Sequence, residues 1–444
     1  MASLTARLGI LGGGISGLSL AWRLKELEVP FWLIDAGQEP GGVLETTEID
    51  EGKYQLSYGA NTLFVDDEVF DFLMRAGLGP EWLPPRPVGK NRYILRGEEY
   101  RALPSGPLSL LFGDFFSFSA KRHIMAELRL RQVGPEDESV YDFFNRRFGR
   151  EVTELVVEPF VGGIYAGDAR RLLMRHTFPQ VQAMEREPGS VLRGLQQQAG
   201  SKRRRSIAFT KGMHVMATFL TVMAEDIYLD QHADLVERLP NSHYRITTPR
   251  DVFECEQLII CLPAWEATRL LKTLQPDGAQ AFSQIRYPEM AQIHLAWPKR
   301  NVNVTLKGFG GLHPPCQGRF TAGAIWVSSL FPLRCPHEEA LLCVFAGGDG
   351  RPPIAGMTNE QILNRAEEEV RFLYRVDGPP TLRHMRRWPR AIPQYDAALT
   401  PLPQHAQALE QQGIFLHTNW YGGVSVYDCI KKALRLAEKL GATL

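Results

Sequence analysis

A glycine triplet near the N-terminus, placed between an apolar segment and an amphipathic one, limits the folds that this chain can adopt. Residues 8–11 form a short apolar run, which is typical of a buried parallel strand. Over residues 15–27 the apolar side chains recur at helical spacing. Between the two, Gly12, Gly14 and Gly17 follow the spacing Gly-x-Gly-x-x-Gly. The pattern predicts a strand, a tight turn and a helix, the frame in which such glycines admit a pyrophosphate.

A dinucleotide fits this frame better than an ordinary glycine-rich turn does. The first glycine permits the turn, the second lets the backbone approach the phosphates, and the third allows close packing of helix on strand. Free N–H groups at the start of the helix favour negative charge. Residues 29–35 indicate a second strand that ends in Asp35, whose carboxylate accepts hydrogen bonds from ribose hydroxyls and repels a 2′-phosphate. NADP is therefore disfavoured.

Two further glycine-rich segments favour FAD over NAD. The pair Gly41–Gly42 follows Asp35 closely, where an NAD domain would usually enter another helix. Flavoproteins of the glutathione-reductase-like kind often carry such a pair beside the cofactor. Residues 59–61 (GAN) form a second stretch of small residues where backbone could meet a cofactor. Taken alone, both segments could be surface turns.

The C-terminal segment repeats this pattern. Residues 414–416 indicate a strand, Gly422 and Gly423 a turn, and residues 424–440 a helix. The start of such a helix is suited to stabilise the negative charge of a reduced flavin, and the alternative is a solvated helix that closes the core. The basic residues of this helix, which suit the end of a helix dipole, are Lys431, Lys432, Arg435 and Lys439. Two such elements at opposite ends of the chain predict one discontinuous domain with the middle of the chain inserted.

The composition disfavours several other classes of protein. With 444 residues, the chain is long enough for about two to three domains. Lys+Arg and Asp+Glu both count 50, so we expect no nucleic-acid partner. Six cysteines without a CxxC pair indicate reduced thiols in a cytoplasmic setting, and we expect neither a disulfide framework nor a bound metal. The N-terminus shows no secretory leader pattern.

The most specific motif lies in the middle of the chain. Residues 148–181 read FGREVTELVVEPFVGGIYAGDARRLLMRHTFPQV. Together with NRYIL (91–95), LIICLPA (258–264), KGFGGLHP (307–314) and GGVSVYDCI (422–430), this stretch resembles the protoporphyrinogen oxidases, oxygen-dependent flavoenzymes of haem synthesis within the flavin amine oxidase superfamily. Matches in the same order extend over nearly the whole chain.

The resemblance implies the architecture and the cofactor. We expect an α/β fold with a discontinuous Rossmann-like FAD domain, a sheet-based substrate domain and a mostly helical inserted domain. The expected FAD domain covers 1–85, 206–265 and 384–444, the substrate domain 86–104 and 266–383, and the helical, membrane-contact domain 105–205. The implied FAD contacts are Gly12, Gly13, Gly14, Ile15, Ser16, Gly17, Asp35, Ala36, Gly42, Val43, Gly59, Ala60, Asn61, Thr62, Ala233, Trp388, Val424, Ser425 and Val426.

The resemblance also implies a porphyrinogen substrate beside the flavin. Arg92 falls where the family has an arginine that pairs with a propionate of the tetrapyrrole, a role that suits the bidentate fork of a guanidinium. Apolar walls and close approach of the backbone are implied at Phe309, Leu312, Phe345, Gly163 and Gly167. From the residues alone, a solvated arginine and plain core packing are the alternatives.

Four positions depart from the family pattern. Glu39 stands where the family usually has Arg before its glycine pair, and Ser57 where it commonly has Glu. Ala60 replaces Pro, and residues 417–418 (HT) replace Ala-Gly. Because Glu39 adds negative charge near the pyrophosphate, we expect weaker flavin affinity than is typical. Backbone N–H contacts survive all four changes, so FAD is still expected.

No catalytic side chain is expected. The sequence offers no Ser-His-Asp set, no His/Cys metal spacing and no carboxylate pair in a catalytic context. This fits hydride transfer from a porphyrinogen methylene bridge to the flavin, for which positioning and exclusion of water supply most of the catalysis. We expect oxidation of protoporphyrinogen IX in three two-electron steps, with O₂ as acceptor and H₂O₂ as product. The alternatives are coproporphyrinogen III oxidation, a flavin amine oxidase, and an inactive flavin-binding scaffold.

Residues 104–132 have the composition of a membrane-surface segment. The apolar residues Leu108, Leu110, Leu111, Phe112, Phe115, Phe116 and Phe118 precede the basic residues Lys121, Arg122, Arg129 and Arg131. An aromatic patch flanked by basic side chains can lie in an anionic membrane interface, and the alternative is a local core beneath the helices. Because the family docks to membranes through this insertion, we expect peripheral attachment on the cytoplasmic face, as a monomer or homodimer.

Overall fold

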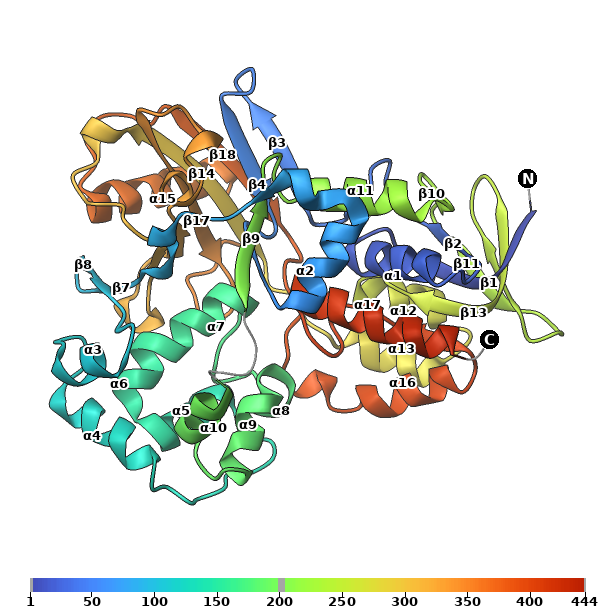
Figure 1. Cartoon of the computed structure of the whole chain (residues 1–444), viewed down its shortest axis with the longest axis horizontal. Helices are drawn as coiled ribbons and strands as arrows, with labels where there is room; N and C mark the ends of the chain where they lie inside the picture. The colour runs from blue at the N-terminus through green and yellow to red at the C-terminus, as the bar shows by residue number, and fades with distance from the viewer. Residues whose placement is uncertain (1–2, 199–203, 443–444) are drawn as a thin grey trace.

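The computed structural model describes residues 3–198 and 204–442 and places two large sheets next to each other, with a group of helices beside them (Figure 1). The first sheet consists of β1 (Ser3–Leu11), β2 (Phe31–Ile34), β10 (Ile227–Tyr228), β11 (Leu235–Arg238), β12 (Tyr244–Thr247), β13 (Val252–Ile260) and β19 (Ile414–Leu416). Its strand order is β10–β2–β1–β13–β12–β11, and β19 also pairs with β13. Strands β10, β2, β1, β13 and β19 are parallel, whereas β12 and β11 are antiparallel at one edge. Both ends of the chain and its middle therefore meet in one sheet.

Helices cover both faces of the first sheet, which explains why its central strands are apolar throughout. Ile10 and Leu33 point into one core, and their neighbours Leu11 and Ile34 point into the other. The helices of the first core include α1 (Ile15–Glu26), α11 (Val215–Ala224) and α17 (Val426–Gly441). Those of the second core include α12 (Ala264–Leu271), α13 (Pro276–Ser283) and α16 (Leu402–Glu410).

The second sheet is mostly antiparallel. It consists of β7 (Arg92–Arg96), β8 (Glu99–Ala102), β14 (Met290–Pro298), β15 (Gly310–Leu312), β16 (Thr321–Ile325), β17 (Glu339–Gly347) and β18 (Leu382–Trp388), in the order β18–β14–β17–β16–β15–β7–β8. One face packs on α15 (Asn359–Tyr374) through residues such as Ile293 and Val370. The other packs on the hairpin of β3 (Glu45–Ile49) and β4 (Tyr54–Tyr58) through Cys343 and Tyr58. This hairpin joins the two glycine-rich segments at 41–42 and 59–61, and Gly59 contacts Gln292 of the second sheet.

A small sheet consists of β5 (Leu63–Val65), β9 (Arg205–Phe209) and β6 (Trp82–Leu83), and α2 (Asp67–Leu73) lies near it. In the sequence, the helical region lies between β6 and β9. Its helices are α3 (Pro107–Phe112), α4 (Phe118–Glu127), α5 (Val140–Phe148), α6 (Arg150–Val152), α7 (Glu158–Tyr165), α8 (Met174–Thr177), α9 (Pro179–Arg186) and α10 (Val191–Gln198). Among the residues that the structure describes, no helix is both long enough and apolar enough to cross a bilayer.

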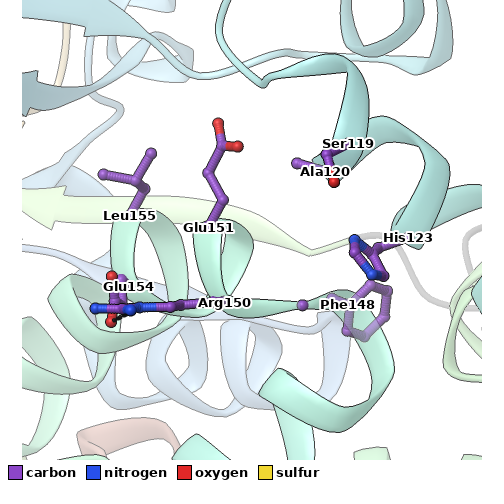
Figure 2. A pocket seen from close by; sticks show the side chains of 9 residues that line it. Ser119, Ala120, His123, Phe148, Arg150, Glu151, Glu154 and Leu155 are labelled. Atoms are coloured by element: carbon purple, nitrogen blue, oxygen red, sulfur yellow. Dashed lines mark hydrogen bonds and ion pairs between the residues drawn. The ribbon is translucent and has the colours of Figure 1, made fainter.

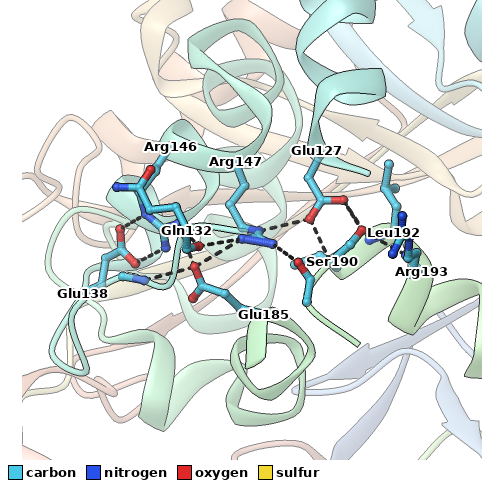
Figure 3. A network of polar contacts seen from close by, with 12 residues as sticks. Glu127, Gln132, Glu138, Arg146, Arg147, Glu185, Ser190, Leu192 and Arg193 are labelled. Atoms are coloured by element: carbon cyan, nitrogen blue, oxygen red, sulfur yellow. Dashed lines mark hydrogen bonds and ion pairs between the residues drawn. The ribbon is translucent and has the colours of Figure 1, made fainter. Parts of the chain in front are cut away.

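A buried ion-pair network holds the helical region together (Figure 3). Arg147 Nε donates to Glu127 at 3.0 Å and its Nη1 to Glu185 at 3.2 Å, and the three side chains are almost completely buried. Glu127 also accepts the N–H groups of Val191 at 2.7 Å and Leu192 at 3.2 Å, in the first turn of α10. Arg147 and Glu127 together therefore connect α4, α5, α9 and α10.

The expected α/β fold is confirmed, with two sheets and a mostly helical insertion. Helices α12 and α13 pack into the core of the first sheet up to Ile285, and β18 carries the second sheet to Trp388. The chain changes from one sheet to the other after these residues, whereas the predicted boundaries are 266 and 384. The division into domains stays a prediction.

Candidate functional site

The three glycines of the first turn have distinct surroundings. Gly12 has a φ of +111°, which favours glycine, and a Cβ there would lie 2.7 Å from the Cys261 carbonyl oxygen. A Cβ on Gly17 would lie 1.9 Å from the Gly12 oxygen, so this glycine is needed for packing of α1 on β1. A Cβ on Gly14 would meet nothing within 4 Å. Gly14 is also the N-cap of α1 and has no side-chain cap, so it borders open space beside free N–H groups.

The second glycine pair lies directly against this turn. Gly41 N donates to the Gly13 carbonyl at 2.8 Å, and Gly41 forms an isolated parallel bridge with Gly14. A Cβ on Gly42 would lie 3.3 Å from Gly14 Cα. Val43, the next residue, is 54% exposed, and so is accessible to a ligand. The structure therefore brings the two glycine segments together, as a shared dinucleotide site requires.

Asp35 closes the other side of the turn. Its carboxylate accepts the N–H groups of Gly13 at 2.5 Å and Gly37 at 2.7 Å. The Asp35 carbonyl accepts Gln231 N at 2.8 Å, which places the segment leading to the buried Ala233 alongside. Each carboxylate oxygen keeps a lone pair beyond these bonds, available to a ribose hydroxyl. Ala36 is exposed next to Asp35.

The turn at 59–62 connects the first site to the second sheet. Gly59 has a φ of +73°, and a Cβ there would lie 2.5 Å from the Val43 oxygen. Its N–H donates to Gln292 Oε1 on β14 at 3.2 Å, and Gln292 Nε2 returns a bond to the Ser57 carbonyl at 2.9 Å. Asn61 is buried, whereas residues 60 and 62 are partly buried. Gln292 thus fixes this turn relative to the second sheet, a role that its place in an apolar strand could have signalled.

The C-terminal glycine turn lies at the start of α1 as well as of α17. His417 Nε2 lies 3.2 Å from the Ser16 carbonyl, in the first turn of α1. Burial, with a smaller contribution from Lys432, lowers the pKa of His417 to about 3, so a neutral ring donates its Nε2–H to that carbonyl. Ser425 caps α17 by accepting Asp428 N at 3.1 Å. The two helix N-termini therefore lie close together.

These residues fit a bound FAD. Gly14 borders an open space, here called the cradle, that any Cβ at this position would enter. Gly42 borders the cradle from the other side. The Thr418 hydroxyl is buried and has no hydrogen-bond partner within the described part of the chain. Two helix N-termini supply N–H groups for negative charge. Glu39, which is expected near the pyrophosphate, is exposed, so water screens its negative charge.

Trp388 differs from the other predicted cofactor residues in its surroundings. It ends β18 and packs in the cluster between the second sheet and the β3–β4 hairpin. Its ring lies 5.1 Å from the Arg386 guanidinium. No contact between Trp388 and the glycine turns is seen among the described residues, so its cofactor role stays a prediction.

Three of the predicted substrate residues share one face of the second sheet. The cross-strand register aligns Leu312 with Gly323, Phe345 and Gln292, and paired residues point to the same side. Arg92 pairs with Gly310, two residues before Leu312, and so belongs to the same face. Because Gln292 reaches the turn at 59–62 from this face, the face is directed toward the cofactor turns.

Arg92, the first residue of β7, is exposed and has no acidic partner within the described residues. Its guanidinium carbon lies 4.5 Å from the centre of the Phe309 ring, a cation–π contact. A Cβ on Gly163 would lie 3.3 Å from Leu312 Cδ2, so α7 borders the same region. Gly167 is explained by packing instead, because a Cβ there would lie 2.6 Å from Gln394 Oε1.

Two described cavities lie away from this face. One of about 400 Å³ is in the helical region, between α4 and α6, where Arg150 and Glu154 form an ion pair at 2.7 Å (Figure 2). The other, of about 230 Å³, lies between α7 and the loop at 349–351, and burial raises the pKa of its Glu158 to about 7. Gly167 lines the second cavity. The remaining predicted substrate residues, Arg92, Gly163, Phe309, Leu312 and Phe345, line neither.

Comparison with known proteins shows which proteins this chain is similar to. Residues 15–440 match the family described as flavin containing amine oxidoreductase. The chloroplastic protoporphyrinogen oxidase 1 of Spinacia oleracea is 30% identical, over 97% of this chain and 83% of its own. Coproporphyrinogen III oxidase of Bacillus subtilis (strain 168) is 24% identical, over 95% of both chains. A solved structure from Exiguobacterium sp. 255-15, provisionally described as a protoporphyrinogen oxidase, superimposes with a TM-score of 0.79 at 19% identity over 100% of both chains.

Proposed function

This chain belongs to the protoporphyrinogen oxidases, within the flavin containing amine oxidoreductases, and we propose that it oxidises protoporphyrinogen IX to protoporphyrin IX with bound FAD and O₂. Three two-electron oxidations remove six electrons and six hydrogens from the substrate. Three O₂ take them up as three H₂O₂. The reaction belongs to porphyrin synthesis.

The observation that carries the proposal is the position of Arg92. A porphyrinogen combines a large apolar ring with carboxylate side chains at one edge. The second sheet offers the complementary arrangement, because Leu312 and Phe345 lie on the face directed at the cofactor turns and Arg92 lies on the same face at the start of β7. A permanently charged guanidinium without an acidic partner is available to bind a propionate in a bidentate fork.

The chain's own residues bind and orient the substrate. Bound FAD supplies the two-electron acceptor for hydride from the methylene bridges. Arg92 fixes the propionate edge, Leu312 and Phe345 contact the apolar ring, and α7 with Gly163 borders the ring from the helical side. Held in this way, the substrate is brought to the cofactor in a reactive orientation and water is excluded, which lowers the barrier without a protein nucleophile.

Coproporphyrinogen III is the second candidate substrate. The similarity to the coproporphyrinogen III oxidase of B. subtilis favours it. That substrate carries more carboxylates, which need more cations. Arg386 lies on the same sheet face as Arg92, but it is already paired with Glu45 at 3.1 Å. The geometry therefore favours the substrate with fewer carboxylates.

Parallel assays of the purified FAD-loaded protein test the proposal. Each porphyrinogen is supplied in air, and porphyrin fluorescence and H₂O₂ are followed together. We expect a higher kcat/KM for protoporphyrinogen IX, with one H₂O₂ per two electrons removed. Preference for coproporphyrinogen III would shift the assignment to that substrate. Oxidation of amines alone would indicate the chemistry of the wider family, and no oxidation of any of them would indicate a scaffold.

We also propose that the helical region attaches peripherally to the cytoplasmic face of a membrane. Leu108, Phe112 and Phe118 are 73%, 83% and 78% exposed. The neighbouring Phe115 and Phe116 are buried in the helical core, so the predicted aromatic run divides between surface and core. The side chain of Leu111 lies outside the described part. Exposed basic residues follow on α4 and after it, which suits an anionic surface.

A further inference from the structure

A partly buried cation lies beneath the C-terminal glycine turn. Lys432, in the second turn of α17, turns back toward the start of its helix, and its Nζ donates to three carbonyl oxygens. These belong to Thr418 at 2.5 Å, Tyr421 at 2.6 Å and Gly423 at 3.3 Å. Within the described residues, no carboxylate lies within ion-pair distance of Lys432. Its neighbour Lys431 behaves ordinarily and pairs with Asp66 at 3.2 Å.

The three carbonyls determine where the N–H groups of the turn point. In a trans peptide the C=O and the N–H point in opposite directions. Carbonyls directed at Lys432 therefore direct the N–H groups of Asn419, Gly422 and Val424 away from it. None of these three N–H groups has a hydrogen-bond partner in the part of the chain that the structure describes. Free donors of this kind form a site for negative charge.

Neighbouring groups act on the charge of Lys432. Asp428, whose carboxylate accepts the Ser425 N–H and hydroxyl at 3.1 and 2.7 Å, carries a negative charge that favours the charged form of Lys432. His417 is neutral for the reason given above. Burial lowers the pKa of Lys432, while its three carbonyl acceptors favour the charged ammonium. The positive end of the α17 dipole adds to the same field.

We propose that Lys432 is a positioning residue for the flavin: it holds the turn at 418–423 so that three free N–H groups and its own charge stabilise the negative charge that the flavin acquires on reduction. The proposal rests on the bound FAD of the proposed function, but not on which porphyrinogen is oxidised. Val424, one of the three donors, is also a predicted FAD contact.

The midpoint potential of the bound flavin tests this role. We compare the parent holoprotein with Lys432→Met, Lys432→Gln and Lys432→Arg, and with Lys431→Met as the matched control on the same helix. In the Met and Gln variants we expect the affinity for reduced flavin relative to oxidised flavin to fall at least about tenfold, which is about 30 mV for a two-electron couple. The Arg variant and the control should keep the parent potential. Unchanged potentials in FAD-loaded Met and Gln variants would overturn the proposal.

A second measurement needs no variant, so it can overturn the proposal even if the substituted proteins do not fold. Hydrogen exchange of residues 417–426 is compared in the parent apoprotein and holoprotein. We expect FAD to slow exchange of the amides of Asn419, Gly422 and Val424 about tenfold or more. Equal exchange in both forms would overturn the proposal. If the parent binds no FAD, the proposed function itself fails, whereas an FAD-loaded parent without these effects loses only the role of Lys432.

Discussion

Single glycines of the first turn have different roles, because one is required for packing and another leaves space for a ligand. Gly17 lies where any side chain would collide with the Gly12 carbonyl, whereas Gly14 borders open space. Both positions follow from backbone geometry alone, so the spacing in the sequence was sufficient to predict them.

Substitution of these two glycines by alanine should have opposite consequences. We expect Gly17→Ala to destabilise the apoprotein by about 2 kcal/mol, because the new methyl forces β1 and α1 apart. Gly14→Ala should leave apoprotein stability nearly unchanged but weaken FAD binding at least about tenfold, because its methyl occupies the cradle. Thermal unfolding and FAD titration measure the two effects. A Gly14→Ala protein that binds FAD like the parent would exclude this cradle.

Arg92 provides the second residue-scale prediction. We expect Arg92→Ala to raise KM for the porphyrinogen about 30-fold, which corresponds to about 2 kcal/mol for a lost charge-assisted hydrogen-bond pair. Arg92→Lys, which keeps the charge but loses the planar fork, should raise it far less. Steady-state kinetics with unchanged kcat would support a binding role. Equal KM effects of the two substitutions would remove Arg92 from that role.

The partners of Lys432 could not be predicted from the sequence. Four basic residues in the C-terminal helix indicated a favourable interaction with the helix dipole or with solvent. The structure instead pairs Lys431 with Asp66 and directs Lys432 at the carbonyls of its own preceding turn. A helical pattern gives the face on which a side chain lies, but not which loop folds back over that face.

At the scale of elements, the apolar patterns at both ends of the chain predicted the structure well. The strand and helix expected at 8–11 and 15–27 are confirmed as parts of β1 (Ser3–Leu11) and as α1 (Ile15–Glu26). The strand at 414–416 is confirmed as β19. The aromatic run at 108–118 was less predictable, because hydrophobicity does not say which side chains a neighbouring helix will cover.

The helical insertion should depend on Arg147. We expect Arg147→Met to destabilise the protein by about 3 kcal/mol or more, because it leaves the buried carboxylates of Glu127 and Glu185 without this partner. Arg150→Met is the matched control: its arginine side chain is 79% exposed and pairs with Glu154, so its loss should cost about 0.5 kcal/mol. Denaturant unfolding compares the variants. Equal effects would show that the buried network contributes no more than a surface pair.

The proposed membrane attachment is a property of the same helical region. We expect Phe112→Ser with Phe118→Ser to reduce binding to anionic vesicles about tenfold or more, because both exposed rings lose their place in the interface. Flotation with phosphatidylserine-containing vesicles at physiological salt measures this. Leu333→Ser, at a residue that is 90% exposed and outside the helical region, is the control. Parent protein that fails to bind such vesicles would contradict the attachment.

At the scale of the whole molecule, one sheet collects the two ends of the chain and its middle, and the second sheet faces the glycine turns that result. The glycine pairs at opposite ends predicted this discontinuity. The exact points at which the chain changes sheets were not predictable, because α12 and α13 follow β13 with an ordinary helical pattern and only their packing assigns them to the first core. The bridge that Gln292 forms between the second sheet and the turn at 59–62 is likewise a property of the assembled fold.

We propose that FAD held in these turns accepts electrons from a porphyrinogen on the face that carries Arg92. Anaerobic mixing of the FAD-loaded protein with protoporphyrinogen IX tests it most directly, with flavin absorbance and porphyrin fluorescence followed in the same experiment. We predict that the oxidised flavin band bleaches as porphyrin fluorescence appears, and that admission of O₂ restores the band. A flavin that stays oxidised in the presence of excess protoporphyrinogen IX would show that this porphyrinogen is not its electron donor.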